Sequence, residues 1–263
     1  MNELITFFAP SIVLSFMLVG IHCYLGLHVL KRQVIFVDLS LAQVAALGYA
    51  FAALWGMETH ELGSYFVALA FTFVAALFFS FASRIKEKIS QEVVIGITFA
   101  FASSLSVLVL NKQGHGAEHI KEMLVGRLLW VSWHEVFKVS IIYSLVGIIH
   151  YIYRAKFFNI KNESSFWNFL FYALFGFVIT SSVGTAGLLL VFSFLIVPGT
   201  ISSLFFEKIK TRLFVGWGIG ALLTVVGLLA SYYLDVPMGA VTVALFTTTI
   251  IVIILVNSLI KQK

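Results

Sequence analysis

The chain has 263 residues, of which 60% are hydrophobic and only 11% are charged, and its mean hydropathy is +1.03. This composition excludes a soluble globular domain, because so few polar side chains cannot cover a water-exposed surface. The single cysteine, Cys23, excludes an intramolecular disulfide framework. We therefore predict an all-α, polytopic membrane protein whose one domain, residues 1–263, contains about eight or nine spanning helices.

Runs of about 20 apolar residues are long enough to cross a bilayer as helices. The first run is predicted to be a retained span, because no basic segment precedes it and no small-residue cleavage pattern follows it. In chain order, the predicted spans are Phe7–Leu30, Val34–Trp55, Leu62–Ser83, Val93–Leu110, Glu135–Tyr153, Phe166–Ser182, Gly187–Phe206, Leu213–Leu234 and Met238–Ile260.

The net charge of +5 is a topology signal. If the connecting loops alternate sides, most Lys and Arg residues fall on one side and Glu58, Glu61 and Asp235 fall on the other. The positive-inside rule then places the basic loops and the C-terminus in the cytoplasm and the N-terminus outside. This distribution argues against a nucleic-acid partner.

The segment from Asn111 to His134 is too short and too charged to span the membrane. Several apolar residues between Met123 and Trp133 can share one helical face, which predicts a short interfacial helix on the outer side. A reentrant turn is the alternative.

The span that ends in Phe206 carries a proline and several glycines. Pro198 removes the amide that would bond to the carbonyl of Phe194, which predicts a kink. Membrane helices tolerate such a defect where protein groups or water satisfy the freed carbonyl, although Pro and Gly are also common in membrane helices without any special role. The candidate structural residues are Pro198, Gly199, Gly184, Gly187 and Gly48.

Four stretches, in order, resemble the permease family of zinc- and manganese-type metal-uptake ABC transporters. The first looks like the family's F-x-G-D-x-x-x-H-x-x-x-x-G signature, and the third is similar to its L-x-G-x-L-L-x-V-S segment. The stretches are RQVIFVDLSLAQVAALGYA (32–50), SQEVVIGITFAFASS (90–104), MLVGRLLWVS (123–132), and GTAGLLLVFSFLIVPGTISSLF with DVPMGAVTVAL (235–245).

The resemblance implies a multi-pass permease of the plasma membrane that imports a divalent metal (zinc, manganese or iron) by alternating access. It also implies a homodimer, a separate cytoplasmic ABC ATPase subunit and an extracytoplasmic metal-binding protein. The chain itself has no GxxxxGK[ST] loop, so ATP hydrolysis would be in another chain. We expect no enzyme activity and no permanently bound cofactor, with the metal as transported substrate.

Two features depart from the family pattern. Aligned on Gly48, the family's Asp and His positions are Leu39 and Gln43 here, with the acid displaced to Asp38. Glutamine is a poorer transition-metal ligand than imidazole or carboxylate. The cytoplasmic loop Arg154–Phe166 is also shorter than the family's ATPase-docking segment. The alternative function is therefore an ATP-independent channel or secondary carrier for a cation or small solute.

Four residues are candidate metal-path groups. Asp38 forms either an ion pair with Lys31 or Arg32 or part of the inner end of the path, and Gln43 either lines the path or hydrogen-bonds between helices. His115 and His119 are four residues apart and Glu118 and Glu122 are close by, so one helical turn would present imidazole and carboxylate together for outer capture of a cation. Ordinary loop residues are the alternative for this pair.

Overall fold

The structure is a computed structural model that describes residues 2–58, 61–85, 87–111, 124–158 and 164–261. Within these residues the regular structure is entirely helical, and nine helices are long and apolar enough to cross a membrane. The predicted all-α class and the nine predicted spans are therefore confirmed. His115 and His119 lie outside the described residues.

Each long helix corresponds to one predicted apolar run, and the short elements lie in the connections between them. The long helices are α1 (Asn2–Arg32), α2 (Val37–Leu54), α3 (Leu62–Ala82), α4 (Gln91–Leu110), α6 (Trp133–Ile152), α8 (Ser165–Ala186), α9 (Leu188–Phe205), α10 (Ile209–Leu234) and α11 (Met238–Lys261). The short elements are the 3-10 turns η1 (Ser83–Ile85) and η2 (Leu128–Trp130) and the helix α7 (Arg154–Phe157).

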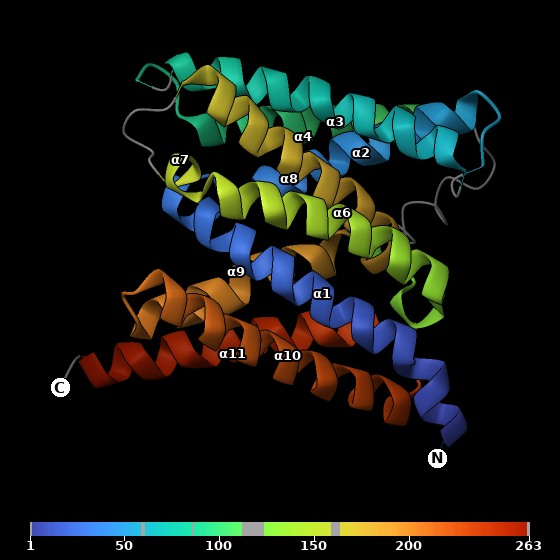
Figure 1. Cartoon of the computed structure of the whole chain (residues 1–263), viewed down its shortest axis with the longest axis vertical. Coiled ribbons are helices and arrows are strands. Elements are labelled where there is room, and N and C mark those ends of the chain that lie inside the picture. The colour runs from blue at the N-terminus through green and yellow to red at the C-terminus, as the bar shows by residue number, and fades with distance from the viewer. Residues whose placement is uncertain (1, 59–60, 86, 112–123, 159–163, 262–263) are drawn as a thin grey trace.

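The helices form two packed groups that meet in the middle of the molecule. Helix α2 packs on α3, α4 and α8, whereas α1 packs on α9, α10 and α6, and α11 covers α9 and α10. In Figure 1, α3 and α4 lie along one side of the bundle, α10 and α11 lie along the opposite side, and α1 and α6 run between them. Helices α2 and α8 are central, since their spans are the most covered by protein, and the α11 span is the least covered.

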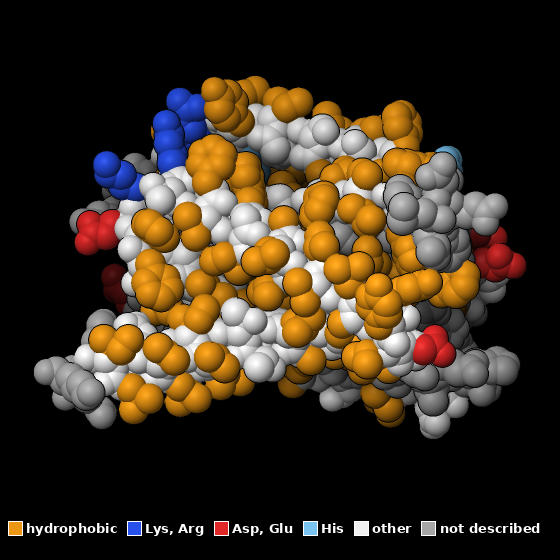
Figure 2. All heavy atoms as spheres, turned by 90° about the horizontal axis from the view of Figure 1, so that it is seen from below, with side chains coloured by type: hydrophobic (Ala, Val, Ile, Leu, Met, Phe, Trp, Pro, Cys, Tyr) orange, Lys and Arg blue, Asp and Glu red, His pale blue; other side chains and the backbone are white. Residues whose placement is uncertain are grey.

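Charged side chains lie at the two ends of the helices, with a hydrophobic belt between them. Figure 2 shows Lys and Arg side chains gathered at the left end of the molecule, where the chain ends after α11. Figure 1 places the N-terminus at the other end. The separation of charges by an apolar belt fits a bilayer-spanning orientation. Below, the end rich in Lys and Arg is called the basic end.

Glycines allow two of the closest helix crossings. A Cβ atom at Gly48 in α2 would lie 2.5 Å from Ala68 Cα in α3, and one at Gly26 in α1 would lie 1.9 Å from the backbone oxygen of Leu195 in α9. Both distances are far below van der Waals contact, so only glycine permits these backbones to approach so closely.

The predicted interfacial helix through Trp133 is wrong within the described part of the chain. Gly126 has φ of +70°, which breaks any helix there. A single 3-10 turn, η2, follows, and Trp133 already belongs to α6. The start of α6 is defined by a capping box, in which the Ser132 hydroxyl accepts from the Glu135 amide and the Glu135 carboxylate accepts from the Ser132 amide.

Pro198 lies inside α9 and packs against small residues of α10. A Cβ atom at Gly216 would lie 3.3 Å from the Pro198 backbone oxygen, and one at Gly220 would lie 3.5 Å from Pro198 Cγ. Gly199 faces Leu30 Cδ1 at an ordinary packing distance, whereas Gly184 has open space where a side chain would point. Packing around Pro198 therefore involves the α10 glycines more than Gly184.

Candidate functional site

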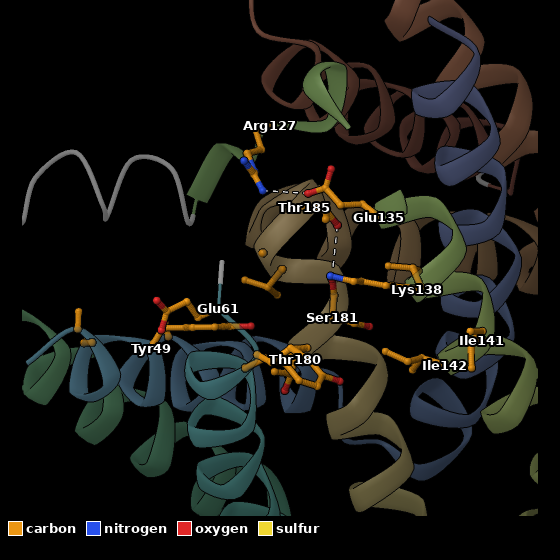
Figure 3. A pocket seen from close by; sticks show the side chains of 18 of the residues that line it. Tyr49, Glu61, Arg127, Glu135, Lys138, Ile141, Ile142, Thr180, Ser181 and Thr185 are labelled. Carbon is orange, nitrogen blue, oxygen red and sulfur yellow. Dashed lines mark hydrogen bonds and ion pairs between the residues drawn. The ribbon is translucent and has the colours of Figure 1, made fainter. Parts of the chain in front are cut away.

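A cavity of about 370 Å³ lies at the end of the bundle opposite to the basic end, where α2, α3, α6 and α8 have their termini. We call it the outer cavity. In Figure 3, Tyr49 and Glu61 form one side and Arg127 and Glu135 lie at another, while the Lys138 side chain extends from α6 toward Ser181 and Thr185 of α8. Its other lining residues include Ala46, Ala50, Leu62, Tyr65, Leu110, Val139, Ile142, Thr180, Val183 and Gly184.

The charges of the outer cavity are only partly paired. Arg127 forms an ion pair with Glu135 at 2.9 Å between Nη2 and Oε1, and the same carboxylate caps α6. Within the described part of the chain, Glu61 and Lys138 have no ion-pair partner and are exposed. The Tyr65 hydroxyl is buried and also lacks a hydrogen-bond partner there. The cavity thus combines free polar groups of both charges with apolar walls.

A second cavity of about 170 Å³, the inner cavity, lies between α2, α4, α8 and α9. Gln43 lines it from α2, and Ser103 and Ser106 line it from α4. The Ser106 hydroxyl donates to the backbone oxygen of Ala102 at 2.8 Å. The Ser103 hydroxyl is buried and has no partner among the described residues. Amide and hydroxyl groups can therefore contact a hydrated cation or small polar solute here, which is the position that we expected for Gln43.

Asp38 lies in the first turn of α2 and is 1% exposed, yet it lines neither cavity. Among the described residues neither carboxylate oxygen has a hydrogen-bond partner, and no ion pair with Lys31 or Arg32 is formed. The Lys31 ammonium instead donates to the backbone oxygen of Phe158 at 2.9 Å. The Asp38 carboxylate lies at the N-terminus of α2, where the helix macrodipole stabilises a negative charge.

Arg32 also points away from Asp38. Its guanidinium donates to the backbone oxygen of Phe157 at 3.1 Å and to Asn168 Oδ1 at 3.0 Å. It also stacks over the Phe171 ring at 4.2 Å. The end of α1 thus holds α7 and α8 together at the basic end.

Sequence reasoning missed a histidine pair near this end. His28 of α1 and His150 of α6 are buried with ring centroids 5.6 Å apart, and the Tyr24 hydroxyl lies 3.4 Å from His150 Nδ1. His28 and His150 are far apart in the sequence, so no local spacing pattern predicts the pair. Only the packing of α1 on α6 brings the two rings together. The structure places no group of three or more His, Cys, Asp or Glu residues that could hold a metal within its described ranges.

Within the described part of the chain, nine helices are long and apolar enough to cross a membrane, and cavities that contain polar side chains lie between them. This arrangement is that of a multi-span membrane protein. The sequence matches the ABC 3 transport family over residues 4–257, and the chain belongs to this family. The resemblance to permeases of metal ABC transporters is thereby confirmed, and the family is one of membrane permease subunits and not of enzymes.

Curated relatives cover most of the chain. The "Probable iron transport system membrane protein" of Haemophilus influenzae is 24% identical over 254 residues, covering 92% of this chain and 87% of that protein. The "Manganese transport system membrane protein MntC" of Listeria monocytogenes is 24% identical over 236 residues, covering 85% and 81%. Metal transport is thus the activity named for both of these relatives.

A solved structure has the same fold. A chain of PsaBC from Streptococcus pneumoniae in complex with Fab aligns with a TM-score of 0.76 at 17% identity, over 94% of this chain and 90% of that chain. At this identity the likeness establishes the helix arrangement and no more.

Proposed function

We propose that the chain is the permease subunit of an ABC importer that carries a divalent transition metal across the plasma membrane. The family match over residues 4–257 is the observation that carries this proposal. The two cavities support it, because they place uncharged polar groups inside the bundle along α2. Two copies of the chain, a cytoplasmic ATPase and an extracytoplasmic metal-binding protein would complete the transporter.

Iron and manganese are the first metals to test, since they are named for the relatives, and zinc is the third. The Gln43 amide and the Ser103 hydroxyl are weak ligands for such ions compared with imidazole or carboxylate. Weak contacts suit passage, because conduction requires an ion to leave as readily as it binds. Asp38, His115 and His119 remain candidate metal-path groups under this proposal.

The ATPase would dock at the basic end. Helix α7 exposes Arg154 and Lys156 there, and Lys31 and Arg32 tie the end of α7 to α1. Movement of a bound ATPase would therefore be passed directly to a spanning helix. The exposed residues 207–210, before and at the start of α10, offer a second contact.

The test is metal accumulation in cells that lack their own uptake system and express this chain together with an ABC ATPase and an extracytoplasmic metal-binding protein from the same organism. We expect higher cellular iron, manganese or zinc, and the ATPase should co-purify with the chain. In Gln43→Leu, uptake should fall about tenfold, because one hydrogen bond to a charged group is worth roughly 1.5 kcal/mol.

The matched control is Thr247→Val, which removes a hydroxyl from the exposed side of α11, where it only donates to the backbone oxygen of Val243. Its uptake should equal that of the parent. Unchanged metal content on expression, with no ATPase recovered, would contradict the proposal.

An ATP-independent channel or carrier is the second candidate, favoured by the small size of α7, which spans only Arg154–Phe157. Such a short element offers little surface for docking. Uptake into proteoliposomes that contain the chain alone, without nucleotide, would support this candidate and exclude the importer.

A further inference from the structure

The outer cavity has an apolar rim. Helices α3 and α6 both pack on α8, and the cavity lies between them, with α2 and α8 also lining it. Leu62 of α3 and Ile141 of α6 line the cavity and are 65% and 47% exposed. Phe66 and Phe137, one turn away on the same two helices, are also exposed. Exposed apolar side chains of spanning helices contact lipid tails, so the rim of the cavity borders the bilayer.

Two charged side chains lie at this rim. Glu61 directly precedes α3 and Lys138 belongs to α6; both are exposed, and neither has an ion-pair partner in the described part of the chain. Figure 3 shows them on different sides of the cavity. Trp130 and Trp133, at the same end of the molecule, are exposed and mark the depth of the lipid headgroups. Lys138 lies about 7.5 Å deeper than Trp133 along α6, and its long side chain can extend back to the headgroups.

The deeper part of the cavity offers an apolar surface to a ligand. Its walls there are small and aliphatic side chains, those of Ala46, Ala50, Val139, Ile142 and Val183. The hydroxyl groups beside them are already bonded within the protein, because Thr180 donates to Thr72 Oγ1 at 3.4 Å and Ser181 donates to the backbone oxygen of Val178 at 2.8 Å. The cavity volume is about 370 Å³. A methylene group is about as large as a water molecule, roughly 30 Å³, so roughly twelve methylenes of one acyl chain fit.

One hydroxyl between the charges and these walls has no partner. Tyr65 lines the cavity one turn after Glu61 in α3. Its hydroxyl is buried and forms no hydrogen bond within the described part of the chain. A buried polar group without a partner is costly, so a ligand that brings an oxygen acceptor to this depth would be stabilised.

We propose that the outer cavity binds one phospholipid with an amine headgroup, from the half of the bilayer opposite to the basic end. The lipid phosphate contacts Lys138, the lipid ammonium contacts Glu61, and an ester carbonyl accepts from Tyr65. One acyl chain fills the apolar part of the cavity. The headgroup supplies the counter-charge that a lipid-exposed lysine in a spanning helix requires, and the apolar walls favour a lipid over a free phosphate.

The bound lipid would join α3 to α6, which belong to the two different packed groups of helices. The proposal does not rest on the transport function. It concerns the surface of the bundle between α3 and α6, whereas Gln43 lies in the inner cavity.

The test is native mass spectrometry of the full chain purified in detergent, which identifies bound lipids by their mass. After delipidation, phosphatidylethanolamine and phosphatidylglycerol with identical acyl chains are titrated in turn. We expect one phosphatidylethanolamine per chain to bind about tenfold more tightly than phosphatidylglycerol, because Glu61 attracts the ammonium and repels a headgroup of net negative charge. Glycerophosphoethanolamine and inorganic phosphate, which lack acyl chains, should not displace the lipid.

Lys138→Gln should weaken the binding of both lipids about tenfold, since both carry the phosphate. Lys138→Arg should retain binding, because arginine also contacts phosphate. Glu61→Gln should remove the preference for phosphatidylethanolamine over phosphatidylglycerol. The matched controls are Lys210→Gln and Glu58→Gln, which remove exposed charges that do not line the cavity and should bind both lipids as the parent does.

Equal binding of the two lipids by the parent would overturn the proposal. So would equal weakening by Lys138→Gln and Lys210→Gln, because that result would mean unspecific attraction to basic residues. Displacement by inorganic phosphate would show that the site takes a free anion, and the absence of any bound lipid would show that something else covers this surface; either result contradicts the proposal. None of these readouts depends on metal transport, so a negative result leaves the proposed function standing.

Discussion

At the residue scale, the absence of a side chain decides how closely helices approach. At Gly26, the backbone oxygen of Leu195 occupies the space in which a Cβ atom would lie. Glycine at such a position allows Cα–H to oxygen contacts and close van der Waals packing, which are the main forces between helices in lipid. Gly20, on the same helix, has nothing within 4 Å of a Cβ position.

We predict that Gly26→Ala lowers the free energy of unfolding by about 2–4 kcal/mol, because two backbones must separate. Gly20→Ala should be neutral or stabilising by roughly 0.5–1 kcal/mol, since alanine is the better helix former. Thermal unfolding of both variants in the same detergent checks this. Equal melting temperatures would mean that α1 and α9 do not cross as described.

At the scale of elements, α7 is stabilised from outside its own sequence. A helix of four residues is too short to be stable alone, and the hydrogen bonds from Lys31 and Arg32 to Phe158 and Phe157 fix it against α1. The Phe157 side chain is fully buried and stacks on His150 with centroids 4.2 Å apart. The basic residues of this loop therefore have a structural role besides their effect on topology.

We predict that Arg32→Met increases amide hydrogen exchange in residues 154–158 about tenfold, because two hydrogen bonds from a charged donor are lost while the apolar stem is retained. Lys31→Met should have a smaller effect, since the Lys31 bond is exposed to solvent. Lys210→Met, at the same end of the molecule but on α10, serves as the control. Unchanged exchange in Arg32→Met would show that the hydrogen bonds of Arg32 do not stabilise α7.

At the scale of the whole molecule, the nine spans place the two termini at opposite ends of the bundle (Figure 1). Figure 1 marks the C-terminus at the end of the molecule where Figure 2 shows Lys and Arg side chains. Because basic loops are usually retained in the cytoplasm, this arrangement predicts that the outer cavity faces outside. Under the proposed import function, that is the side from which the substrate arrives.

We predict that green fluorescent protein fused after Lys263 fluoresces and is protected from external protease, while a tag before Met1 is accessible to antibody on intact cells. A fluorescent C-terminal fusion with a protected N-terminal tag would show that both termini are cytoplasmic and that one of the nine helices does not span. A dark C-terminal fusion with a protected N-terminal tag would reverse the orientation and the assignment of the outer cavity.

The sequence by itself determined the class of the protein, the number of spans and the family. A spanning helix can be predicted from local sequence, because each run must be apolar along its own length and must form its backbone hydrogen bonds within itself. The position of Gln43 facing inside the bundle also followed from a local rule, since a polar amide avoids lipid.

Only the tertiary structure decided which polar groups meet. Glu61, Arg127 and the α6 residues Glu135 and Lys138 come from three segments to one cavity, and His28 and His150 meet from different helices. It also showed that Lys31 and Arg32 bind carbonyls near α7 and not Asp38. Helices that are apolar all round carry no stripe that marks their inward face. The inward face is therefore set by packing between distant segments, which the close contact of Gly126 with Gly187 shows most directly.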